Sequence, residues 1–134
     1  MERIISELDA IPETMLIPLW AKATETMRKD ALLVDSKAVE IMQKIDYDFS
    51  KFRKAKASQV GCCIRAKLID EEVTAFLNEH PDAVVIQLGA GIDARYERLG
   101  SPMVTHWFDL DLEEAIKLRK KFLNETACNT YIAA

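Results

Sequence analysis

VVIQLGAGIDAR, the stretch at residues 84–95, is an apolar run that ends in a glycine turn. A second apolar run ends in acid at residues 107–111, which read WFDLD. The first run predicts a strand that stops at Gly89, a close approach to the backbone at Gly91 and a helix that starts near Asp93. Gly91 lies 20 residues before Asp111, about the separation at which a βαβ unit presents a ribose-binding carboxylate. The stretch therefore predicts a site for a nucleoside-bearing cofactor.

The composition is that of a globular protein. The chain has 134 residues, the length of one ordinary domain. Its composition, 49% hydrophobic and 30% charged, excludes a disordered chain. The net charge of −4, with Lys and Arg scattered, argues against a nucleic-acid partner. No apolar run approaches the roughly 20 residues that cross a bilayer, so we expect no membrane partner. Residues 1–7 carry acids and no long apolar core, and we expect no secretory signal there.

The cysteines and histidines do not form a metal or disulfide pattern. Cys62 and Cys63 are adjacent and Cys128 is distant, which is neither a disulfide framework nor a CxxC motif. His80 and His106 have no cysteine or acid at metal-ligand spacing, so we expect both to be structural and predict no metal site. A reducing cytoplasm is the expected location.

The chain predicts two parts, a helical cap segment at residues 1–81 and an α/β part at residues 82–134. Helices are expected from Pro12, with one stripe at residues 15, 16, 19 and 20, and after a cap at Asp35 or Ser36, with residues 39, 42 and 45 inward. Residues 47–59 should form a loop or a short exposed helix. A longest helix should run from about Val60 to Glu79, with residues 69, 73, 76 and 77 on its inner face.

In the second part, strands are predicted at residues 83–88 and 104–110, with a third beginning at Tyr131. Helices at about 93–99 and 112–124 should connect them, the latter with Ile116 and Phe122 inward. Doubly wound sheets usually carry about five or six strands, so we expect the front half of a larger domain. Its sheet would expose an edge through which the chain could form a homo-oligomer.

The cofactor is a choice between two nucleosides. Gly89, Gly91 and Ala94 satisfy the dinucleotide fingerprint, and Asp111 suits NAD and S-adenosylmethionine equally. Asp93 would repel a diphosphate at the helix start but tolerates the ammonium at the aminoacyl end of S-adenosylmethionine. The long helical segment before the first strand is also unlike an NAD domain. These features favour S-adenosylmethionine, and an NAD-dependent oxidoreductase fragment stays open.

Four segments carry a family resemblance. LGAGIDAR at residues 88–95 resembles the LGAGLDTR motif of the leucine carboxyl methyltransferase family, with Ala94 where Thr is usual. WFDLDL at 107–112, IRAKLID at 64–70 and IPLWAKA at 17–23 resemble the family's acidic second strand, its Arg-x-x-x-Ile-Asp helix and its N-terminal segment. The family includes bacterial O-methyltransferases of the tetracenomycin polyketide type. The resemblance implies the N-terminal half of a Rossmann-like, class I S-adenosylmethionine methyltransferase fold, behind a helical segment.

The resemblance implies a role for each candidate residue of the α/β part. Gly89 and Gly91 would let the backbone pass beneath the cofactor, and Asp111 would accept hydrogen bonds from both ribose hydroxyls. Asp93 would lie near the aminoacyl end. We expect Asp109 to point away from Asp111 and interpret it as a helix cap or a loop residue.

Two candidates precede the glycine turn. The resemblance implies that Arg65 pairs with the methionyl carboxylate, where a guanidinium makes a bidentate bond, and that Lys22 adds a second positive contact. The alternative for each residue is an exposed, solvated side chain with no role in binding.

The implied activity is methyl transfer to a carboxylate or hydroxyl of a small-molecule or polyketide-like acceptor. The family's adenine-holding and acceptor-holding residues follow the third strand, so we assign no catalytic residue here and expect this portion alone to be inactive. Two alternatives remain, the NAD-dependent fragment and a non-catalytic remnant that self-associates.

Overall fold

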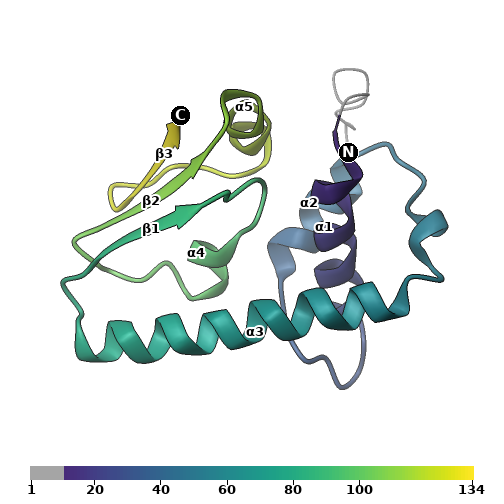
Figure 1. Cartoon of the computed structure of the whole chain (residues 1–134), viewed down its shortest axis with the longest axis horizontal. Helices are drawn as coiled ribbons and strands as arrows, with labels where there is room; N and C mark the ends of the chain where they lie inside the picture. The colour runs from purple at the N-terminus through teal and green to yellow at the C-terminus, as the bar shows by residue number, and fades with distance from the viewer. Residues whose placement is uncertain (1–10) are drawn as a thin grey trace. The chain divides into compact units, whose positions relative to one another are not determined.

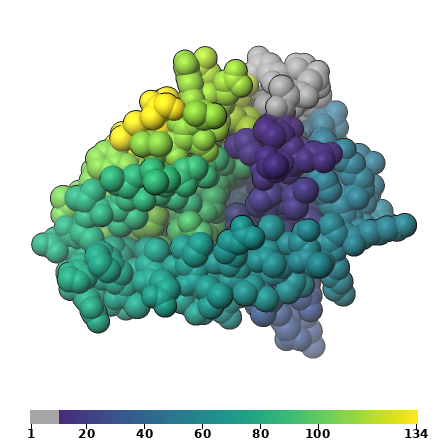
Figure 2. Space-filling view, viewed as in Figure 1, coloured from purple at the N-terminus to yellow at the C-terminus, as the bar shows by residue number. Residues whose placement is uncertain are grey.

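A computed structural model describes residues 11–134, and the expectation for residues 1–7 lies outside this range. The chain divides between Leu68 and Ile69 into two compact units, which we describe separately. The division falls within one helix, α3 (Lys56–Glu79), whose side chains are exposed along much of its length (Figure 2). Between residues 11 and 134, no helix combines the length and apolar character that crossing a membrane requires.

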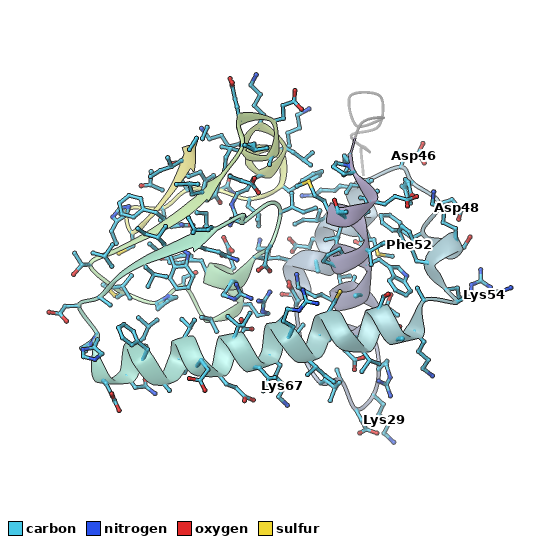
Figure 3. The ribbon with its side chains drawn as sticks, in the orientation of Figure 1. Lys29, Asp46, Asp48, Phe52, Lys54 and Lys67 are labelled. Carbon is cyan, nitrogen blue, oxygen red and sulfur yellow. The ribbon has the colours of Figure 1, made fainter. Side chains whose placement is uncertain are left out.

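The first unit consists of helices (Figure 1), and their buried apolar side chains form a small core. It contains α1 (Glu13–Thr26), α2 (Ser36–Lys44), a short 3-10 helix, η1 (Phe49–Phe52), and the first part of α3. Asp35 caps α2, as predicted, because its carboxylate accepts a hydrogen bond from the Ala38 amide at 2.9 Å. The ring of Phe52, labelled in Figure 3, packs at 5.7 Å from that of Trp20, and both are buried.

The predicted inner faces of two helices are only partly correct. On α3, Val73 and Leu77 pack against the core as predicted, but Ile69 and Phe76 are 40% and 53% exposed. The buried residues of α3 are small or polar ones: Gln59, Cys63, Ala66 and Asp70. Such residues contribute little to a hydrophobic stripe, so the sequence pattern pointed to larger neighbours.

On the predicted inner face of α2, Ile45 is buried, but Val39 and Met42 are only partly buried. The buried residues within α2 are Ala38 and Ile41.

The second unit is built on a three-stranded parallel sheet in the order β1-β2-β3. The strands are β1 (Val84–Leu88), β2 (His106–Asp111) and β3 (Asn129–Ala133), and the helices between them are α4 (Arg95–Arg98) and α5 (Glu113–Phe122). This βαβαβ arrangement is the Rossmann-like α/β fold that the sequence predicts (Figure 1). Two details differ: the helix predicted at 93–99 is a single turn, and β3 begins two residues before Tyr131.

One face of this sheet is packed. Trp107 of β2 is fully buried and lies against Tyr96 of α4, with the ring centroids 5.4 Å apart. Val104 completes the cluster, with Val85 and other half-buried residues around it. Trp107 is therefore a core residue.

The opposite face is apolar and exposed along β1. Val84, Ile86 and Leu88 are 56%, 59% and 75% exposed, and they stand in register with His106, Phe108 and Leu110 of β2. Parallel strands normally read as continuous apolar runs because both faces are covered. The run that predicted β1 thus has only alternate residues, such as Val85, at least half-buried within this structure.

Substitutions on the exposed face and on the packed face of the sheet should differ greatly in their effect on the free energy of unfolding. We expect Ile86→Lys to change the free energy of unfolding by less than about 1 kcal/mol, because its side chain already meets solvent. Trp107→Ala should lower it by about 3–5 kcal/mol through the cavity left in the core. Urea unfolding followed by circular dichroism compares the two, and a large loss for Ile86→Lys would mean that this face is packed.

Candidate cofactor-binding site

The turn after β1 depends on glycine for its backbone conformation. Gly89 and Gly91 have φ values of 66° and 49°, in the left-handed region. A Cβ added at Gly89 would meet no atom within 4 Å, so crowding is not the reason for glycine there. The left-handed conformation itself is the reason, because a side chain destabilises it. The turn ends β1 sharply, as the sequence predicts.

Asp111 joins the end of β2 to this turn. Its Oδ2 accepts a hydrogen bond from the Gly91 amide at 2.8 Å, and its Oδ1 accepts one from the Leu112 amide at 2.7 Å. The side chain is half-buried. Because each carboxylate oxygen has further acceptor capacity, Asp111 can still accept hydrogen bonds from a ligand. The structure thus brings together Gly91 and Asp111, the two residues on which the predicted spacing depends.

Asp109 lies within β2, two residues before Asp111, and is fully buried. Its Oδ2 accepts hydrogen bonds from Arg119 Nη2 at 2.9 Å and Asn129 Nδ2 at 3.0 Å, and its Oδ1 from Trp107 Nε1 at 3.2 Å. The interpretation of Asp109 as a helix cap or loop residue is wrong, because it is a strand residue in a buried ion pair. The expected orientation away from Asp111 is also wrong, because both residues belong to β2 and side chains two residues apart on a strand lie on the same face.

Asp93 has protein partners for both carboxylate oxygens. Oδ1 accepts a hydrogen bond from Arg98 Nη1 and Oδ2 one from Gln87 Nε2, each at 2.9 Å, and Arg95 Nη1 lies 3.6 Å from Oδ2. The Asp93 amide donates to the Ala90 carbonyl at 2.9 Å. In this structure Asp93 holds the glycine turn, and an aminoacyl ammonium would share a carboxylate that is already paired.

Asp70 of α3 completes a four-residue ionic cluster. It accepts hydrogen bonds from Arg95 Nε at 2.8 Å and from Arg98 Nε and Nη2 at 2.6 and 2.9 Å. Burial by itself lowers the pKa of Arg98, but the hydrogen bonds and charges of Asp70 and Asp93 outweigh it and raise that pKa. Two acids and two arginines therefore fasten α3, the glycine turn and α4 to one another.

Sequence reasoning missed Arg98 and Arg119. Arg119 Nη1 donates to the carbonyl oxygens of Gly91 and Asp93 at 3.1 and 2.8 Å. A signal for Arg119 was present, since it lies three residues from both Ile116 and Phe122, on the face of α5 predicted to point inward. A charged residue within an apolar stripe indicates a buried, paired group.

Burial next to Arg119 also affects Tyr131 of β3. The Arg119 guanidinium lies 4.5 Å from the centre of the Tyr131 ring. Burial raises the pKa of Tyr131 to about 12. The hydroxyl therefore stays protonated at neutral pH and carries no charge into this part of the molecule.

Lys22 and Arg65 belong to the first unit. Lys22 lies on α1 and is buried, with 8% of its surface exposed. It is therefore not an exposed, solvated lysine. Arg65 lies on α3 and is exposed, as is Lys67, which points away from the helix (Figure 3). Their roles toward a cofactor carboxylate stay predictions.

The metal-ligating residue types are dispersed. Among residues 11–134, no three His, Cys, Asp or Glu side chains are grouped so that they could hold a metal ion. Cys62, Cys63 and Cys128 are free, and Cys63 is buried with its Sγ 3.4 Å from the Ala21 carbonyl oxygen, to which it donates.

A parallel sheet with a glycine turn after its first strand and an acid at the end of its second is typical of α/β domains that bind nucleoside-bearing cofactors. The family model for leucine carboxyl methyltransferase matches residues 16–130. The chain belongs to the leucine carboxyl methyltransferase family.

Two curated relatives agree with the family match. Tetracenomycin polyketide synthesis O-methyltransferase TcmP of Streptomyces glaucescens is 37% identical over 118 residues, which cover 88% of this chain and 44% of the relative. The S-adenosyl-L-methionine-dependent methyltransferase dpfgK of Gibberella zeae is 30% identical over 131 residues, which cover 90% of this chain and 43% of the relative. The chain thus spans less than half the length of these relatives.

Proposed function

We propose that this chain supplies the S-adenosylmethionine-binding part of an O-methyltransferase. The observation that carries the proposal is the hydrogen bond from the Gly91 amide to Asp111 Oδ2, at 2.8 Å. It sets a carboxylate beside a glycine turn at the carboxyl ends of two parallel strands, which is where a ribose is bound in such sheets. Family membership and the printed name of the second relative support the choice of this cofactor.

In the proposed complex, Asp111 accepts hydrogen bonds from the ribose hydroxyls while it keeps its bonds to the backbone. Gly89 and Gly91 offer a backbone without side chains beneath the cofactor. Asp93 lies near the aminoacyl end of the cofactor and stabilises the turn that lies there. Arg65 and Lys22 are proposed, on the family resemblance, as partners of the methionyl carboxylate.

The proposed reaction is the transfer of the methyl group from the sulfonium to a carboxylate or hydroxyl oxygen. Such an in-line displacement is accelerated mainly by holding the acceptor collinear with the bond that breaks. The first relative's name, which refers to tetracenomycin polyketide synthesis, supports a small-molecule, polyketide-like acceptor. We propose a cytoplasmic location, supported by three free cysteines, and self-association through the exposed β1 side of the sheet.

The test is calorimetric titration of the full 134-residue chain with S-adenosylhomocysteine and, separately, with NADH. We expect binding of S-adenosylhomocysteine and at least about tenfold weaker binding of NADH, a difference of roughly 1.4 kcal/mol or more. Preferential binding of NADH would support the oxidoreductase alternative. A dimer in size-exclusion chromatography with no binding of either ligand would support the non-catalytic alternative.

A further inference from the structure

A buried arginine of α5 holds the glycine turn through its carbonyl groups. Arg119 is fully buried, and its Nη1 donates to the carbonyl oxygens of Gly91 and Asp93 at 3.1 and 2.8 Å. We propose that Arg119 is a positioning residue, which fixes the peptide planes of the glycine turn in the orientation that receives the cofactor. The part of the proposal that concerns cofactor binding rests on the proposed function. The part that concerns the orientation of the turn rests on the contacts of Arg119 alone.

The charge of Arg119 is neutralised within the same structure. A buried guanidinium is stable only when it is paired and hydrogen-bonded. Asp109, also fully buried, accepts from Arg119 Nη2 at 2.9 Å and is itself fixed by hydrogen bonds from Trp107 and Asn129. The pair is therefore neutral overall, and Arg119 acts on the turn through its directed donors.

The contacts determine which way the amides of the turn point. In a trans peptide the N–H lies opposite the C=O. Because the carbonyls of Gly91 and Asp93 are aimed at Arg119, the N–H groups of Ile92 and Ala94 are aimed away from it. Without Arg119 these two peptide planes would be free to rotate, and the turn would present a mixture of donors and acceptors to a ligand.

The arrangement requires the shape of a guanidinium as well as its charge. Nη2 of the planar group meets the Asp109 carboxylate while Nη1 meets two carbonyl oxygens. A lysine keeps the charge, but it has a single nitrogen and cannot reproduce both sets of bonds. Arg119→Lys therefore separates the geometric role from the electrostatic one.

The first experiment follows amide hydrogen exchange by NMR on the full chain without a ligand. In Arg119→Lys we expect the amides of Gly91 and Asp93 to exchange at least about tenfold faster relative to the Trp107 amide of β2, because only the turn is loosened. Ile116→Val, a matched buried change on the same helix, should leave this ratio unchanged. Equal acceleration of all amides, or none, in Arg119→Lys would overturn the proposal.

The second experiment measures S-adenosylhomocysteine affinity for the same variants. We expect Arg119→Lys to weaken binding by about tenfold or more and Ile116→Val to leave it unchanged, since a displaced turn misplaces the cofactor. If the unaltered chain does not bind, the proposed function fails while the exchange data still decide the role of Arg119 in the turn. If the lysine variant loosens the turn yet binds equally well, the role in cofactor binding is overturned.

A third variant covers the case in which Arg119→Lys does not fold. Arg119→Gln combined with Asp109→Asn replaces the ion pair with neutral amides and leaves no unpaired buried charge. It should show the same selective acceleration at Gly91 and Asp93, because the glutamine side chain is shorter than that of arginine and its amide nitrogen falls short of the two carbonyls. An unchanged exchange ratio in this pair would count against the proposal.

Discussion

Asp70→Ala is expected to lower the free energy of unfolding of the second unit by about 3–5 kcal/mol, the effect of removing one partner from a buried ion pair. Asp70 accepts three hydrogen bonds from Arg95 and Arg98, and the Arg98 side chain is only 4% exposed. Without Asp70, the two guanidinium groups would lose these three hydrogen bonds. The turn should also loosen, because Asp93 would be drawn toward the arginines that have lost Asp70.

Urea unfolding monitored by the fluorescence of Trp107 measures this effect, in a Trp20→Phe background so that the signal comes from the second unit. Glu71→Ala is the matched control, since Glu71 is the next acid on α3 and is exposed, and it should change stability by less than about 0.5 kcal/mol. Asp70→Asn keeps the shape and should fall between them. Equal stabilities for Asp70→Ala and Glu71→Ala would show that the ionic cluster contributes nothing.

Asp111→Ala is expected to weaken S-adenosylhomocysteine binding by about 100-fold or more. Each hydrogen bond from a ribose hydroxyl to a carboxylate contributes about 1.5–3 kcal/mol, and the proposed site makes two. About 2.8 kcal/mol already corresponds to a 100-fold change in affinity. The variant also loses the acceptor for the Gly91 amide, which adds to the effect.

Glu113→Ala provides the control, because Glu113 is an exposed acid two residues further along, paired with exposed Lys117 at 3.4 Å. Its affinity for S-adenosylhomocysteine should equal that of the unaltered chain. Circular dichroism of Asp111→Ala should retain the native spectrum, which separates loss of binding from loss of fold. Unchanged affinity in a folded Asp111→Ala variant would remove the ribose role.

The strands and the turn could be predicted because their signals are local. A continuous apolar run and two glycines in left-handed conformations are properties of a few neighbouring residues. They led to β1 and to the turn at Gly89–Gly91. The cap at Asp35 is local in the same way.

The helix faces were less predictable, because the residues that α3 buries are small or polar. Cys63 and Ala66 allow close packing and contribute little hydrophobicity, while Ile69 and Phe76 are large and exposed. A hydrophobic stripe records which side chains are apolar, and it does not record which neighbours another element can approach.

The sequence by itself determined the family, the parallel βαβαβ order and the placing of Gly91 and Asp111 at the ends of neighbouring strands. Only the tertiary structure decided what holds the glycine turn: Asp70 lies 25 residues before Arg95, and Arg119 lies 28 residues after Gly91. The physical reason is that a charged side chain can be buried only where partners from distant segments neutralise it, and those partners meet only once the chain has folded. The conformation of the glycine turn is therefore determined by its own residues, and its orientation is held by charged side chains from distant segments.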